Sequence, residues 1–380
     1  MKKIIAFILI TLVVACSTDD GAGNGPNNGN GGNNNNPDPT GFDRSAMLAN
    51  WADNIIIPSY QAFDTEVEAM RNSFATLQGD LTEANLIAFR QSWLSAYQVW
   101  QYAAPYEIGP AENVDLRLNI NTYPTNTTKI EDFVTNGGYD LSLPSNREAK
   151  GFPALDYLIN GLGTTDSEII MVLTNVGGEA YLVYINDVLA DMDVTFSAVL
   201  TEWTADYRDT FVSNSGSSAT ASVDRMVNDY IFWYEKFLRA GKMGIPLGVF
   251  SGSPIPENVE SYYGEVSKAL FLSGFQAAQD FFNGKHYNSN STGESLASYL
   301  NALGTEIDNT PLANLINTQF TAAQAAVSNL SSFKDELENN NPPTQMLLAY
   351  DEVQRLVPYF KVDMVSALSI SIDFVDADGD

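Results

Sequence analysis

Residues 85–101 read NLIAFRQSWLSAYQVWQ, and this stretch decides the fold class. Its large apolar side chains recur at intervals of three and four residues, which is the spacing of one face of an α-helix. The members of this stripe are Leu86, Phe89, Trp93, Tyr97 and Trp100. Such a stripe packs against a core, so the stretch predicts an amphipathic helix inside a helical protein.

The same spacing recurs along most of the chain from Phe42 onward. Further apolar stripes predict helices over residues 60–77, 181–203, 223–237, 259–277, 312–330 and 346–372. A length prior of roughly 150 residues per domain suggests two domains, and segments rich in Gly and Pro offer boundaries between them. The chain is therefore expected to be all-α, with one helical-bundle domain at 41–215 and a second at 216–380.

Two local features depart from this pattern. Residues 114–121 alternate apolar and polar side chains, and a period of two predicts a short extended segment. Pro58 and Pro358 fall inside helical stripes. Because proline lacks an N–H and clashes with the preceding turn, we expect a kink or a division of the helix at each.

The first forty residues predict an export signal and a tether. A pair of lysines precedes an apolar run, residues 4–14, that is too short to span about 30 Å of hydrocarbon as a helix. Small residues then precede Cys16, the only cysteine, as in a bacterial lipoprotein box. Residues 1–15 therefore predict a signal peptide and Cys16 a lipidation site; the alternative is an ordinary secretory signal. Residues 16–40, rich in Asn and Gly, predict a flexible tether.

Lipidation would attach the protein to a membrane, because acyl chains on Cys16 supply the anchor. Asp19 and Asp20 lie just after this cysteine. They resemble the acidic export signal of surface lipoproteins in Bacteroidetes-type bacteria. We therefore expect an outer-membrane lipoprotein at the cell surface, with the periplasmic face as the alternative.

The charge balance and the rare residues exclude several classes of function. The chain has 19 Lys and Arg against 47 Asp and Glu, a formal net charge of −28, whereas a nucleic-acid binder needs a basic face. One Cys and one His cannot build a disulfide framework or a zinc finger. The histidine, His286, lies in a Gly-Lys-His-Tyr-Asn stretch and is expected in an exposed loop rather than as a metal ligand.

Five segments, taken in order, resemble the imelysin-like family of bacterial envelope proteins, also classed as M75 peptidases. They are residues 50–60 (NWADNIIIPSY), 93–101 (WLSAYQVWQ), 116–124 (LRLNINTYP), 150–158 (KGFPALDYL) and 242–248 (KMGIPLG). The resemblance implies a two-domain, all-helical fold with a cleft near the domain junction. It also implies a link to iron uptake.

The hallmark of that family is Gly-x-His-x-x-Glu, proposed as a metal-binding element, and it is degenerate here. Gly151 is present, Pro153 stands at the His position and Asp156 stands at the Glu position. A His and a carboxylate three residues apart share a helix face, but proline offers no side-chain ligand. Asp156 is the remaining candidate metal ligand. Iron or another divalent or trivalent cation would suit oxygen ligands, and the sequence leaves the identity of any cofactor open.

Six polar residues are predicted to line the cleft between the domains. They are Glu107, Arg117, Asn121, Tyr123, Arg239 and Lys242. The alternative is structural: Arg117 would pair with a carboxylate, and the other two basic side chains would form ion pairs. The closing residues 375–380 resemble the start of a Ca²⁺ loop without its downstream Glu, so a solvated acidic terminus is expected.

The leading hypothesis is a non-catalytic lipoprotein of the cell envelope that binds a small ligand, a metal or an envelope partner in an iron-acquisition system. The loss of the motif histidine argues against peptidase activity. Two alternatives stay open: an M75-type metallopeptidase with a carboxylate-based site, and a surface adhesin or scaffold that does not use the cleft.

Overall fold

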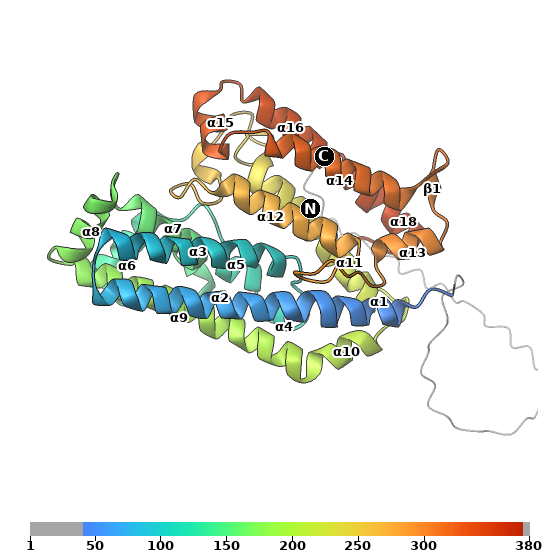
Figure 1. Ribbon diagram of the computed structural model, residues 1–380, viewed down its shortest axis with the longest axis horizontal. Coiled ribbons are helices and arrows are strands. Elements are labelled where there is room, and N and C mark those ends of the chain that lie inside the picture. The colour runs from blue at the N-terminus through green and yellow to red at the C-terminus, as the bar shows by residue number, and fades with distance from the viewer. Residues whose placement is uncertain (1–40, 375–380) are drawn as a thin grey trace, which may run out of the picture. The chain divides into compact units, whose positions relative to one another are not determined.

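The computed structural model describes residues 41–374 of the 380-residue chain. The predictions for the signal peptide, the lipidated Cys16, the tether and the acidic carboxyl terminus lie outside the described residues. Helices make up nearly all of the regular structure in residues 41–374 (Figure 1), which confirms the all-α prediction.

The first half of the described chain contains three long helices and a larger number of short helical segments. They are α1 (Arg44–Asn50), η1 (Trp51–Ile56), α2 (Ile57–Gly79), α3 (Glu83–Ala103), α4 (Pro110–Asn113), α5 (Leu116–Ile120), α6 (Thr127–Asn136), η2 (Pro144–Ala149), α7 (Gly151–Asp156), η3 (Tyr157–Gly161), α8 (Asp166–Thr174), α9 (Gly178–Glu202), η4 (Trp203–Tyr207) and α10 (Arg208–Ser213).

The second half adds helices and one two-stranded antiparallel ribbon, in which β1 pairs with β2. The elements are α11 (Ser222–Phe232), η5 (Trp233–Gly244), η6 (Pro256–Asn258), α12 (Ser267–Phe282), α13 (Leu296–Ala302), β1 (Glu306–Ile307), β2 (Thr310–Pro311), α14 (Leu312–Ser328), α15 (Phe333–Asn339), α16 (Thr344–Gln354), α17 (Leu356–Pro358), η7 (Tyr359–Met364) and α18 (Val365–Leu368). Of the η segments, η2 and η6 are 3₁₀ turns and the others are π-helical.

The long helices pack side by side around a continuous apolar core. α2 lies along both α3 and α9, and α12 packs against α3 and against α14, which in turn contacts α16 (Figure 1). All five tryptophans are buried: Trp51, Trp93, Trp100, Trp203 and Trp233. The contact between α12 and α3 joins residues from the two sides of the predicted domain boundary at 215/216. The division into two domains stays a prediction.

Two of the local predictions were wrong. Residues 116–120 form the short helix α5 rather than an extended segment, because Leu116 and Ile120 are buried together one helical turn apart. The apolar stripe predicts a helix that begins at Val259, but α12 begins at Ser267. The preceding residues form turns in which Ser261 has a φ of 56° and Glu265 a φ of 57°.

The two prolines mark places where helices change their winding. The π-helical η1 ends two residues before Pro58, and the π-helical η7 begins directly after Pro358. Proline cannot donate to the carbonyl four residues earlier, so the α-helical hydrogen-bond ladder is interrupted there. The expected division at Pro58 therefore takes the form of a π-helical stretch between α1 and α2, with no intervening loop.

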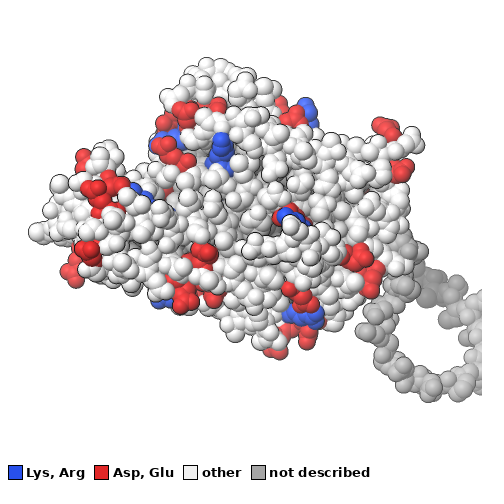
Figure 2. All heavy atoms as spheres, viewed as in Figure 1, with Lys and Arg blue, Asp and Glu red and all other residues white. Residues whose placement is uncertain are grey.

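Within residues 41–374, no single helix has both the length and the apolar composition to cross a membrane. The segments Asp166–Thr174 and Gly178–Ser213 meet that test only as a pair, and they are bent by 101°. α9 buries Ile185, Val188 and other apolar side chains in the core, which accounts for its composition. On the face shown in Figure 2, Asp and Glu side chains form several separate groups, some of them beside Lys or Arg.

Candidate functional site

Gly151 begins α7 and fixes the position of the degenerate motif. Its φ angle is +70°, a conformation that glycine adopts at little cost. A Cβ atom added here would lie 2.1 Å from the carbonyl oxygen of Ile120. The backbone of the motif helix therefore packs directly against the end of α5, and only glycine allows that approach.

Gly151→Ala is expected to lower the free energy of unfolding by about 2 kcal/mol, because the left-handed φ and the clash with Ile120 both strain the chain. Urea denaturation followed by circular dichroism measures the loss. Gly137→Ala is the matched control, since Gly137 also has a positive φ of +66° but no atom within 4 Å of an added Cβ. Equal losses in the two variants would contradict a role for the close contact.

Asp156 ends α7, and its side chain is buried, with 1% relative exposure. Its Oδ1 accepts hydrogen bonds from the Gly264 N–H at 2.8 Å, Asn160 Nδ2 at 3.0 Å and Ser261 Oγ at 3.1 Å. Its Oδ2 accepts a fourth from the Tyr263 N–H at 3.0 Å. Burial raises the pKa of Asp156 to about 6, and these hydrogen bonds oppose that rise. The carboxylate thus ties α7 to the turn that precedes α12.

The residues around the motif do not fit the metal that the family hallmark implies. Pro153 and Asp156 lie together in the wall of a cavity of about 80 Å³, which Tyr123 and Tyr263 also line. Pro153 offers no ligand, and the Asp156 oxygens already accept four hydrogen bonds. Within the described part of the chain, no group of three or more His, Cys, Asp or Glu side chains could hold a metal ion.

His286 lies in the loop after α12 and does not replace the motif histidine. Its N–H donates to the Ser291 carbonyl at 2.9 Å, and the next N–H, of Tyr287, donates to the Asn54 carbonyl at 2.8 Å. The loop is thereby attached to η1. His286 is not among the residues that line the cavity beside Asp156.

Glu260 is the centre of a second buried polar group. It is 0% exposed and forms an ion pair with Lys242. Its Oε1 accepts hydrogen bonds from Asn121 Nδ2 at 2.7 Å and from Gln101 Nε2 at 3.4 Å. Burial lowers the pKa of Lys242, and the neighbouring Glu260 charge opposes that fall. Sequence reasoning singled out Lys242 and Asn121 but missed Glu260, the residue that joins them.

Four of the six predicted cleft residues meet at one place in the structure. Arg117, Asn121, Tyr123 and Lys242 all line a cavity of about 20 Å³. That volume has room for about one water molecule. Burial raises the pKa of the Tyr123 phenol well above its usual value. The structure therefore brings these four residues together around one small cavity, whose wall also includes Trp100, Trp233 and Phe237.

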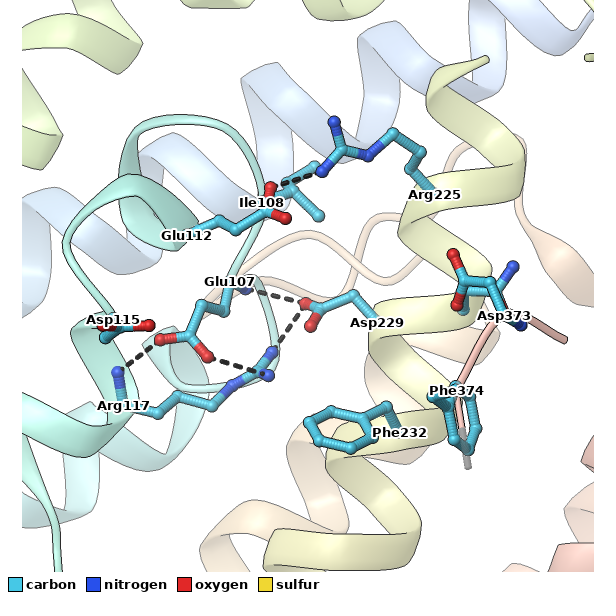
Figure 3. Close-up of a pocket in the computed structure, with 11 residues that line it drawn as sticks. Glu107, Ile108, Glu112, Asp115, Arg117, Arg225, Asp229, Phe232, Asp373 and Phe374 are labelled. Atoms are coloured by element: carbon cyan, nitrogen blue, oxygen red, sulfur yellow. Dashed lines mark hydrogen bonds and ion pairs between the residues drawn. The ribbon is translucent and has the colours of Figure 1, made fainter. Parts of the chain in front are cut away.

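Arg117 holds a third buried group, shown in Figure 3. Its Nη2 bonds Asp229 Oδ2 at 2.6 Å, its Nη1 lies 3.3 Å from Glu107 Oε2, and its Nε donates to the Ala104 carbonyl at 2.6 Å. Burial raises the pKa values of Asp229 and Glu107, and the guanidinium partly offsets the rise. Burial opposes the Arg117 charge, but the two carboxylates raise its pKa.

Arg239 forms its own cluster on η5. Its Nη1 donates to the Tyr350 hydroxyl at 2.8 Å and to Gln354 Oε1 on α16, and its Nη2 lies 3.6 Å from Glu235 Oε1. Lys361 of η7 lies 3.1 Å from the other oxygen of Glu235. Arg239 therefore connects the helices of the second half by hydrogen bonds and ion pairs.

The Arg117 group also forms the floor of an open cavity of about 240 Å³ (Figure 3). Glu112 and Arg225 form an ion pair at its margin, and Phe232 and Phe374 form an aromatic wall. Its remaining lining residues are Ile108, Asp115, Asn228 and Asp373. Sequence reasoning missed Asp229, because it lies 112 residues after Arg117 within an otherwise apolar helical stripe.

Comparison with known proteins identifies a family and solved structures of similar fold. A family model described as Imelysin, Peptidase M75, matches residues 56–357. The fold resembles that of an iron-regulated protein A precursor from Parabacteroides distasonis, with a TM-score of 0.67 and 16% identity over 84% of this chain and 95% of that one. It also resembles an imelysin-like protein from Psychrobacter arcticum, with a TM-score of 0.67 and 15% identity over 87% of this chain and 97% of that one. No curated protein matches the chain.

Proposed function

The chain belongs to the imelysin family, and from that premise we propose that it is a cell-envelope protein without peptidase activity that binds a ligand. Its place is the outer membrane, to which lipid on Cys16 attaches it, and its role is in iron acquisition. The lipoprotein box at Cys16 supports the membrane attachment. The relative described as an iron-regulated protein supports the link to iron.

The observation that carries the absence of peptidase activity is the environment of Asp156. A metallopeptidase needs a metal that several side chains hold and that keeps one position open for water. Pro153 cannot supply a ligand, and four donors from the protein already occupy the Asp156 carboxylate. The helix α7 carries the motif, but its Asp156 carboxylate holds the turn before α12 by hydrogen bonds.

Metal analysis and a peptidase assay on the purified protein test this proposal. We expect less than stoichiometric metal and no peptide cleavage that a chelator abolishes. Stoichiometric metal together with chelator-sensitive cleavage would overturn the proposal. Asp156→Asn is measured beside the wild type. Its control is Asp351→Asn, which removes the same charge from an exposed position on α16 and so shows any change that follows from charge alone.

The membrane attachment has a separate test. Metabolic labelling with a radioactive fatty acid is expected to mark the wild-type protein and not the Cys16→Ser variant, because the thiol is the acceptor. Ser17→Ala is the matched control and keeps the label. A Cys16→Ser variant that stays labelled would contradict lipidation at this residue.

A further inference from the structure

We propose that the cavity above Arg117 binds a small organic cation that carries an aromatic or other apolar body. This inference deepens the proposed function, because it gives the ligand class of a non-catalytic binding protein. The cavity has a volume of about 240 Å³, and Figure 3 shows the residues that line it. Five carboxylates and only two guanidinium groups line it.

Most of these charged side chains form ion pairs within the protein. The exceptions are Asp373 and one oxygen of Asp229, and both residues line the cavity. Glu112 pairs with Arg225, and Asp115 pairs with Arg147 at 2.5 Å. The Asp373 carboxylate has no ion pair or hydrogen bond with any other residue in 41–374.

Asp229 provides the second unmatched acceptor. Both of its hydrogen bonds, from Arg117 Nη2 and from the Glu107 N–H, go to Oδ2. Among the described residues, Oδ1 has no donor. Three carboxylate oxygens, two on the exposed Asp373 side chain after α18 and one on Asp229 of α11, therefore remain for a cationic ligand.

The position of Asp373 is fixed by the protein. Asn228 Nδ2 donates to the Ser371 carbonyl at 3.0 Å, and Asn228 Oδ1 accepts from the Asp373 N–H at 3.1 Å. This pair of bonds holds the chain after α18 against α11. The wall that carries Asp373 is thus already in place before a ligand enters, which lowers the ordering cost of binding.

Aromatic rings form the apolar side of the cavity. The ring centroids of Phe232 and Phe374 lie 5.3 Å apart at 64°, and Ile108 adds an aliphatic surface. Lys361 Nζ lies 5.9 Å from the Phe374 centroid, so one cation of the protein is already placed beside this ring. Carboxylates beside aromatic faces suit a planar amidinium, guanidinium or amine with an apolar body. A bare metal ion fits poorly, because the carboxylates do not converge on one point.

Isothermal titration of the full chain with benzamidinium and with its neutral analogue benzamide tests the proposal. Benzamidinium should bind at least ~10-fold more tightly, since one charge-assisted hydrogen bond accounts for about that factor. Asp373→Asn should weaken benzamidinium binding ~10-fold, and Phe374→Ala should weaken both compounds. Asp351→Asn removes the same charge from an exposed position on α16 and should leave binding unchanged.

Three outcomes would overturn the inference: no binding of benzamidinium at millimolar concentration, equal binding of the two compounds, or equal effects of Asp373→Asn and Asp351→Asn. Circular dichroism shows whether each variant is folded. Metal content and peptide cleavage do not enter this experiment. If benzamidinium does not bind, the proposed absence of peptidase activity is unaffected. If peptidase activity is found, the titration still tests the cation site.

Discussion

Asp156→Ala is expected to lower the free energy of unfolding by about 3 kcal/mol at pH 7. The substitution removes the acceptor of four hydrogen bonds and leaves the part-buried N–H groups of Tyr263 and Gly264 without a partner. A buried donor left unpaired costs about 1–3 kcal/mol, and relaxation of the turn recovers part of the total. Urea denaturation of the two proteins measures the difference.

Asp156→Asn separates the hydrogen bonds from the charge. With its oxygen at the Oδ1 position, asparagine can still accept from Gly264, Ser261 and Asn160, and only the Tyr263 N–H meets an amide nitrogen. We therefore expect a loss of about 1 kcal/mol. Losses near zero in both variants would show that Asp156 does not hold this turn.

The difference between the wild type and Asp156→Ala should also depend on pH. Burial raises the pKa of Asp156 to about 6 in the folded chain, from an ordinary value of 3.8. The folded state therefore binds the proton more tightly, and the stability that this adds is fully present below about pH 4 and is lost as pH rises through about 6. The two proteins should differ by about 2 kcal/mol more at pH 4 than at pH 7. A difference that stays constant across this range would contradict the raised pKa.

The sequence predicts the helices well because their apolar stripes record burial directly. The turn around Glu260 shows where this fails. Val259, Tyr263 and Val266 have helical spacing, yet the positive φ of Ser261 breaks the helix, and the N–H groups thus freed bind Asp156. Apolar spacing carries no information about backbone donors. It could therefore indicate neither the partner of the motif carboxylate nor the turn that it holds.

The candidate site shows the same limit for charged side chains. Arg117 and Glu107 stand out in the sequence because they are polar residues among aromatics and glycines. Their partner Asp229 comes from α11, far along the chain, and only the packing of that helix brings it to the guanidinium. The structural alternative for Arg117 is a pair with a carboxylate, and in the structure Arg117 pairs with Asp229. The same two residues also line the open cavity.

Arg117→Met is expected to have the largest effect, a loss of about 3–5 kcal/mol in the free energy of unfolding. The side chain is 3% exposed, and its removal leaves the carboxylates of Glu107 and Asp229, which are 15% and 12% exposed, without a cation. Removal of one partner from a buried ion pair costs about this much, because the remaining charge loses both water and its counter-ion. Urea denaturation at pH 7 measures the loss.

Arg225→Met is the matched control on the same cavity. Its guanidinium pairs with Glu112, but the two side chains are 42% and 53% exposed. Water can replace such a pair, so we expect a change within about 0.5 kcal/mol. If Arg117→Met costs no more than Arg225→Met, the buried cluster does not stabilise the fold.

The deficit of Arg117→Met should shrink as pH falls from 7 towards 5. Burial already raises the pKa values of Glu107 and Asp229, and the guanidinium limits that rise. Without it both folded-state pKa values increase further, so the variant gains stability by taking up protons as pH falls. The double variant Arg117→Met with Asp229→Asn removes one of the stranded charges and should recover part of the loss at pH 7. An additive double variant would mean that Arg117 and Asp229 act independently, in conflict with the 2.6 Å bond between them.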